Sequence, residues 1–159
     1  VSELAQRLKP IFRSAGYRVN EDTLLKLTPL VQERLVVLDD ALEKAGFFFE
    51  DEVHPAPDEL IGKNMSPEES VNAAYEVYSL LSKLHSINQD VAESPLRELA
   101  EKLGIKVGQL FGIIRVAVTG QKISPPLFES MEIIGRDKVL NRIQNAIIIL
   151  EEVEKRRAD

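Results

Sequence analysis

The chain has 159 residues, of which 44% are hydrophobic and 29% are charged, a composition typical of a folded globular domain. Its formal net charge of −6 repels polyanions overall, so any surface for nucleic acid must be local. The sequence contains no cysteine, which excludes disulfides and thiolate metal sites, and it contains neither a membrane-length apolar run nor a secretory signal.

Signals for helix starts and stops recur along the whole chain. Four Ser/Thr-Pro pairs each offer an N-cap hydroxyl followed by a proline, whose missing N–H has no partner in the first helical turn anyway. These pairs are Thr28-Pro29, Ser66-Pro67, Ser94-Pro95 and Ser124-Pro125. Glu69 stands at the right offset from Ser66 to complete a capping box. The glycines that can end helices are Gly16, Gly46, Gly104, Gly120 and Gly135.

Apolar residues between these signals recur at helical spacing, and no segment alternates in the manner of a strand. The pattern therefore predicts an all-α fold. The predicted helices are 2–15, 20–43, 67–86, 95–103, 106–119, 125–134 and 136–157. Pro29 is expected to divide the second of them, because it removes a backbone hydrogen bond and clashes with the preceding turn.

The segment between Phe49 and Met65 interrupts the helical pattern. It combines the breaker runs His54-Pro55-Ala56-Pro57 and Gly62-Lys63-Asn64. We therefore expect two small helical subdomains, residues 1–64 and 65–159.

Residues 102–128 of the second half contain no acidic residue. The basic residues of this window are Lys102, Lys106, Arg115 and Lys122. In a chain of negative net charge, such a window favours a surface prepared for phosphates.

Motifs for catalysis or metal binding are absent from the sequence. His54 and His85 stand far apart, whereas a zinc site needs three or four donors at regular spacing. There is no glycine-rich phosphate loop after a predicted strand. We expect no catalytic and no metal-binding residue here. Because the chain begins at Val1 without an initiator methionine, we also expect a fragment of a longer chain or a processed one.

The order of residues from Leu110 to Arg142 is similar to that of a known family. The matching segments read Leu110-Phe111, Arg115-Val116-Ala117-Val118-Thr119-Gly120, Pro125-Pro126-Leu127-Phe128-Glu129 and Gly135-Arg136-Asp137-Lys138-Val139-Leu140. They resemble the C-terminal, anticodon-binding region of bacterial glutamyl-tRNA synthetases, which are class I aminoacyl-tRNA synthetases. The resemblance implies that the two helical subdomains form an anticodon-binding cage for glutamate tRNA, in a cytoplasmic protein that is monomeric and has no membrane partner.

A complete synthetase of this family also carries a Rossmann catalytic domain, with His-x-Gly-His-type and Lys-Met-Ser-Lys-Ser-type sequences that bind ATP. Neither is present in this chain, and Lys63-Asn64-Met65-Ser66 only echoes the second in the wrong order. We therefore expect ATP and Mg to serve that absent domain. This chain alone should need no cofactor and should not make aminoacyl-tRNA.

Arg115 is the sharpest candidate for a residue that reads RNA. It is the one charge between Lys106 and Lys122, in a segment otherwise made of apolar residues and small or polar neighbours. Such an arginine can extend to solvent from a packed helix or pair with a carboxylate elsewhere. The resemblance instead implies that it faces the anticodon, where its planar fork suits base edges and phosphate.

Ser124, Pro125 and Leu127 follow at a predicted corner between helices. The sequence predicts Ser124 as an N-cap and Pro125 as the first helical residue. The resemblance implies that the same corner contacts an unstacked anticodon base, with Leu127 as its apolar surface.

Arg34 is a further candidate anticodon-binding residue. The resemblance implies that it reads the third anticodon base and favours a cytosine there. The alternative interpretation is that Arg34 is only an exposed arginine on a helix. Lys102, Lys106 and Lys122 would contribute salt-dependent attraction to the RNA backbone without sequence information.

A function of another class is also compatible with these residues. Helix faces and arginines can equally form a protein–protein module whose basic window docks an acidic partner. Specific preference for glutamate tRNA over an unrelated tRNA would distinguish the two hypotheses.

Overall fold

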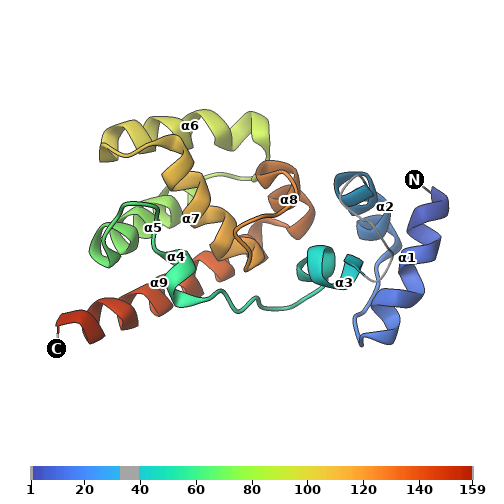
Figure 1. Ribbon diagram of the computed structural model, residues 1–159. Coiled ribbons are helices and arrows are strands. Elements are labelled where there is room, and N and C mark those ends of the chain that lie inside the picture. Colours follow the sequence, from blue (N-terminus) through green and yellow to red (C-terminus); the bar gives the residue numbers. More distant parts are fainter. Residues whose placement is uncertain (1, 33–39, 159) are drawn as a thin grey trace. The chain divides into compact units, whose positions relative to one another are not determined.

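The computed structural model describes residues 2–32 and 40–158 (Figure 1). The chain divides into two compact units, Val1–Glu52 and Val53–Asp159. Every regular element in the described parts of both units is a helix, so the predicted all-α fold is confirmed. None of these helices is both long enough and apolar enough to cross a membrane.

The first unit contains α1 (Ser2–Ser14), α2 (Glu21–Val31), α3 (Asp40–Ala45) and the 3-10 turn η2 (Gly46–Phe48). Its core is formed by side chains at helical spacing on α1 and α2 together with aromatic rings of the turn. The ring centroid of Phe12 lies 4.9 Å from that of Phe49. Phe47 and Phe48 are buried, so this phenylalanine run serves packing.

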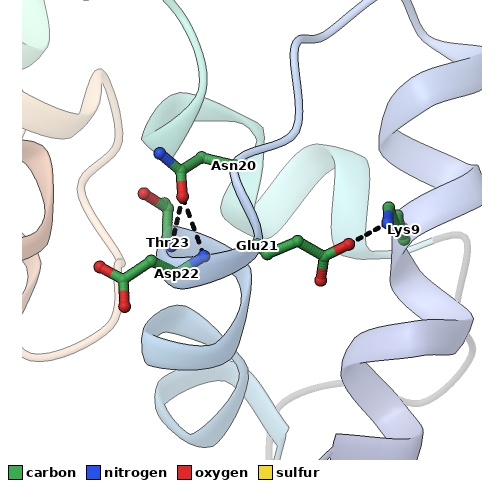
Figure 2. A network of polar contacts seen from close by, with 5 residues as sticks. All are labelled: Lys9, Asn20, Glu21, Asp22 and Thr23. Atoms are coloured by element: carbon green, nitrogen blue, oxygen red, sulfur yellow. Dashed lines mark hydrogen bonds and ion pairs between the residues drawn. The ribbon is translucent and has the colours of Figure 1, made fainter.

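Polar contacts hold the start of α2 (Figure 2). Asn20 is the N-cap, and its Oδ1 accepts hydrogen bonds from the backbone N–H groups of Asp22 at 2.9 Å and Thr23 at 3.3 Å. Lys9 of α1 donates a hydrogen bond to the carboxylate of Glu21, which joins the two helices.

Glu21 is expected to make the first unit more stable at neutral than at acid pH. The hydrogen bond from Lys9 holds the pKa of the Glu21 carboxyl below its ordinary value. A lowered folded-state pKa stabilises above the unfolded pKa, about 4.3, and the contribution is lost as pH falls through the lowered value. Urea unfolding followed by amide-resolved NMR should show Glu21→Gln destabilised at pH 7 and equal to the unsubstituted chain at pH 2. Glu3→Gln is the exposed control, and an equal effect of Glu21→Gln at both pH values would contradict the expectation.

The second unit contains α4 (Pro57–Leu60), α5 (Pro67–Ser82), α6 (Gln89–Leu103), α7 (Val107–Thr119), α8 (Leu127–Ile134) and α9 (Arg136–Ala158). The long α9, red in Figure 1, packs along α5 and also contacts α4, α7 and α8. All six of these helices contribute large side chains that are fully buried between them. They are Leu60, Leu81, Leu96, Leu110, Ile113, Ile114, Met131 and Ile143.

The division between the units lies between Glu52 and Val53, not near residue 64 as the breaker runs suggested. Residues 53–64 belong to the second unit because they are packed into it. Leu60 is fully buried, and α4 contacts α7 and α9. The N–H of Gly62 donates to Ser70 Oγ at 3.0 Å.

Only one of the four predicted Ser/Thr-Pro starts is confirmed in its predicted form. Ser66 caps α5 with a full capping box, in which Ser66 Oγ accepts from Glu69 N and Glu69 Oε1 accepts from Ser66 N, both at 3.1 Å. Thr28-Pro29 and Ser94-Pro95 instead lie inside helices. Pro29 itself lies inside α2, which ends two residues later at Val31, and residues 33–39 lie outside the described part of the chain.

The true start of α6 lies at Asn88, whose side chain accepts a hydrogen bond from Val91 N at 3.0 Å. The buried face of α6 begins before Pro95, earlier than predicted, and this explains why the helix can contain a proline. Ala92, Leu96, Leu99 and Ala100 all face the core. Burial of this longer stripe outweighs the one backbone hydrogen bond that Pro95 removes.

Replacing Ser66 with alanine is expected to lower the free energy of unfolding by about 0.5–2 kcal/mol, the cost of losing an N-cap. The reason is that the N–H of Glu69 would lose its acceptor at the exposed start of α5. Urea denaturation measures this difference. Ser82→Ala, at the other end of the same helix, is the control, and an equal loss in both variants would argue against the cap.

Candidate nucleic-acid interface

The candidate site lies where α7 ends. Gly120 follows the helix with φ +75°, a left-handed conformation that glycine adopts without strain, and its N–H donates to Val116 O at 2.8 Å. Thr119 Oγ1 donates to Arg115 O at 2.7 Å and accepts from Gln121 N at 3.1 Å. These bonds turn the chain sharply back across the end of α7.

Arg115 and Ser124 are brought together by this turn. Arg115 lies on the last turns of α7 and is partly exposed, whereas Ser124 is 6% exposed. Arg115 Nε donates to Ser124 Oγ at 2.9 Å, and Ser124 Oγ donates to Pro125 O at 2.9 Å. The guanidinium is therefore bonded through Nε to the predicted corner.

The prediction that Ser124 caps a helix and that Pro125 begins it is wrong. Helix α8 begins at Leu127, and its N-cap is Pro126, which has no capping side chain. The hydroxyl of Ser124 accepts a hydrogen bond from Arg115 Nε and donates one to Pro125 O. The local Ser-Pro pattern could not show this, since Arg115 lies nine residues away.

Pro125 and Leu127 are buried beneath the corner, and Leu127 is 5% exposed. Phe128 is also buried, and its ring meets Phe111 edge-on with centroids 5.4 Å apart. The guanidinium carbon of Arg97 lies 5.5 Å from the centroid of the Phe111 ring. The aromatic residues near the corner therefore serve packing between α6, α7 and α8.

The three predicted phosphate contacts are exposed but do not form one cluster. Lys102 lies in the last turn of α6, Lys106 precedes α7 and Lys122 follows it. The 13 residues of α7 separate the last two by roughly 20 Å at 1.5 Å per residue. Lys122 shares a groove of about 450 Å³ with Lys63, beside Gly108 and Gly112 of α7.

Arg142 of α9 binds the backbone at the end of α7, next to the candidate site, and its role was not predicted from the sequence. Although charged, it is 3% exposed, and its Nη1 donates to Val118 O at 2.7 Å. This carbonyl is one of those left without an intrahelical partner at the end of α7. The available signal was its spacing, since Val139, Ile143 and Ala146 on the same stripe of α9 are all buried.

A second arginine of α9, Arg136, also donates hydrogen bonds to backbone carbonyls at the end of a helix. Arg136 Nε donates to Leu84 O and its Nη2 to Ser82 O, both at 2.8 Å, at the end of α5. Positive charge at a helix C-terminus is favourable because of the helix dipole.

Two further predictions concern Arg34 and the two histidines. Arg34 lies outside the described residues. His54 and His85 are exposed, and the described residues contain no group of three metal-ligating side chains.

The chain matches the family model described as an anticodon binding domain over residues 3–147, and it belongs to that family of helical domains. It is 37% identical to the glutamate–tRNA ligase of Dehalococcoides mccartyi, over 95% of this chain and 32% of the relative. It is 39% identical to that of Roseiflexus sp., over 91% of this chain and 30% of the relative. The resemblance first seen between Leu110 and Arg142 is thereby confirmed and extends over nearly the whole chain.

The solved structures agree on the fold. The crystal structure of a glutamate tRNA ligase from Elizabethkingia meningosepticum superposes with a TM-score of 0.76 at 21% identity, covering 92% of this chain and 28% of that one. The chain thus spans about a third of the length of the curated relatives it matches.

Proposed function

We propose that this chain binds the anticodon loop of glutamate tRNA as part of a glutamate–tRNA ligase. The observation that carries the proposal is the hydrogen bond of 2.9 Å between Arg115 and Ser124 at the end of α7. Membership of the anticodon binding domain family and the relatives that are glutamate–tRNA ligases support it. ATP and Mg would serve the parts of such a ligase that lie outside this sequence, in a cytoplasmic, monomeric enzyme.

The chemistry of the corner suits an unstacked base. A guanidinium presents N–H donors in a rigid plane, and the bond from Nε to Ser124 Oγ orients that plane at the corner. Preorganisation of this kind lowers the entropy lost on binding. We assign base recognition to Arg115, which Ser124 orients. Pro125 and Leu127, which were predicted to contact the base, are buried and would hold the corner in shape instead.

The other predicted residues take supporting roles in the proposal. Lys102, Lys106 and Lys122 are exposed and would contribute attraction to the RNA backbone at separate points. Arg34 stays a prediction for discrimination of the third anticodon base.

Equilibrium binding tests the proposal. The 159-residue chain would be titrated with an anticodon stem–loop of glutamate tRNA and with that of an unrelated tRNA, across a salt series. We expect both affinities to fall with salt but the glutamate stem–loop to keep its advantage at physiological ionic strength. Equal affinity for both at every salt concentration would contradict the proposal and favour a basic surface for an acidic protein partner.

A further inference from the structure

The loop between α7 and α8 exposes a large apolar side chain at the corner. Ile123 is 83% exposed, although the next residue in the chain, Ser124, is 6% exposed. The other large apolar side chains that are exposed among the described residues are less so and lie on helices. They are Leu25 at 43%, Tyr75 at 51%, Val91 at 38% and Ile148 at 57%.

Hydrogen bonds hold residues on both sides of Ile123. The backbone N–H of Gln121 donates to Thr119 Oγ1 at 3.1 Å, and the side-chain hydroxyl of Ser124 accepts from Arg115 Nε at 2.9 Å. Isoleucine is branched at Cβ, so its χ1 angle has few alternatives. The loop therefore presents an apolar side chain with few rotamers directly before the serine that bonds the guanidinium.

The exposure of Ile123 contrasts with the burial of its apolar neighbours. Leu127 is 5% and Phe128 6% exposed, so neither offers a face to a ligand without being uncovered first. Leaving an isoleucine in water forgoes the stabilisation that burial would give. A polar residue at the tip of the loop would incur no such loss.

We propose that Ile123 is the apolar surface on which one unstacked base of the anticodon packs. This inference rests on the proposed function, and it adds a residue to the Arg115 and Ser124 pair. Proteins that read single-stranded RNA bond to the edge of a splayed base and cover its flat face with a side chain. Arg115 and Ser124 supply the polar half of such a site, and Ile123, adjacent to Ser124, supplies the other half.

A matched pair of substitutions tests the proposal. Ile123→Val and Ile123→Thr have side chains of the same shape, but threonine places a hydroxyl against the base. We expect Ile123→Val to bind the glutamate anticodon stem–loop within about twofold of the unsubstituted chain and Ile123→Thr to bind roughly three- to tenfold more weakly. Ile148→Thr, on exposed α9 surface, is the control and should bind unchanged. All three variants should keep the thermal midpoint, because both positions are largely exposed.

The base itself is identified with stem–loops that lack one anticodon base at a time. If Ile123 packs on one base, the difference between the Val and Thr variants disappears for the RNA that lacks this base and persists for the other two. Equal binding of the two variants to the intact stem–loop, or a difference that persists with all three altered RNAs, would overturn the inference. In either case, a preference of the unsubstituted chain for the glutamate stem–loop would leave the proposed function standing. Absence of that preference would overturn both.

Discussion

Replacing Arg142 with alanine is expected to lower the free energy of unfolding of the second unit by about 2–4 kcal/mol, the largest effect among the stability predictions. The truncation removes a buried side chain that is 3% exposed, together with its hydrogen bond of 2.7 Å to Val118 O. The carbonyl of Val118, a buried residue at the end of α7, would then lose this charged donor. Urea denaturation of the second unit measures the loss.

A comparison with methionine separates the two causes. Arg142→Met keeps much of the side-chain volume without the charge, and a buried guanidinium costs desolvation that methionine avoids. We therefore expect Arg142→Met to lose less than half as much stability as Arg142→Ala. Arg156→Ala, in the exposed last turn of α9, should change stability by less than about 0.5 kcal/mol. Losses as small in Arg142→Ala as in Arg156→Ala would contradict a structural role for the buried arginine.

Replacing Arg115 with alanine is expected to weaken binding of the glutamate anticodon stem–loop by about 1–3 kcal/mol, the scale of one good bidentate base contact. Arg115→Lys should recover little, because an ammonium cannot reproduce the planar fork or the bond from Nε to Ser124 Oγ. Fluorescence titration at physiological salt measures these affinities. Arg7→Ala removes an exposed arginine of α1 that pairs with Glu3, and it serves as the charge-matched control.

The partner of Arg115 gives a second check on the same site. Ser124→Ala removes the hydroxyl that orients the guanidinium, so we expect a smaller loss of affinity than in Arg115→Ala. The double variant should bind about as weakly as Arg115→Ala alone, because the serine acts through the arginine. Unchanged binding by Arg115→Ala, or additive losses in the double variant, would show that this pair does not form the reading site.

A helix was predicted correctly where the capping residues lay directly before the run of apolar residues that forms its buried face. Ser66 and Glu69 lie at the head of α5, whose buried face follows immediately, and both the cap and the helix are as expected. At Ser94-Pro95 the two signals disagreed. Ala92 is fully buried two residues before the serine, and packing of the earlier turn placed the start at Asn88.

The parts that could not be predicted depend on residues distant in sequence. The breaker-rich segment between Phe49 and Met65 suggested a boundary near residue 64, but Leu60 is buried and α4 contacts α7 and α9. The stripe of α9 indicates that Arg142 faces inward, yet it does not reveal that its acceptor is Val118, 24 residues away. The acid-free window indicated a basic surface, but its lysines lie at separate points, with Lys102 in α6, Lys106 before α7 and Lys122 after it.

The most direct test of the account is an NMR titration of the ¹⁵N-labelled chain with the glutamate anticodon stem–loop. We predict that the Nε–Hε resonance of Arg115 and the backbone amides of Gln121, Lys122, Ile123, Ser124 and Leu127 shift together in proportion to RNA bound. Binding that moves resonances elsewhere and leaves Arg115 and this loop unchanged would contradict it.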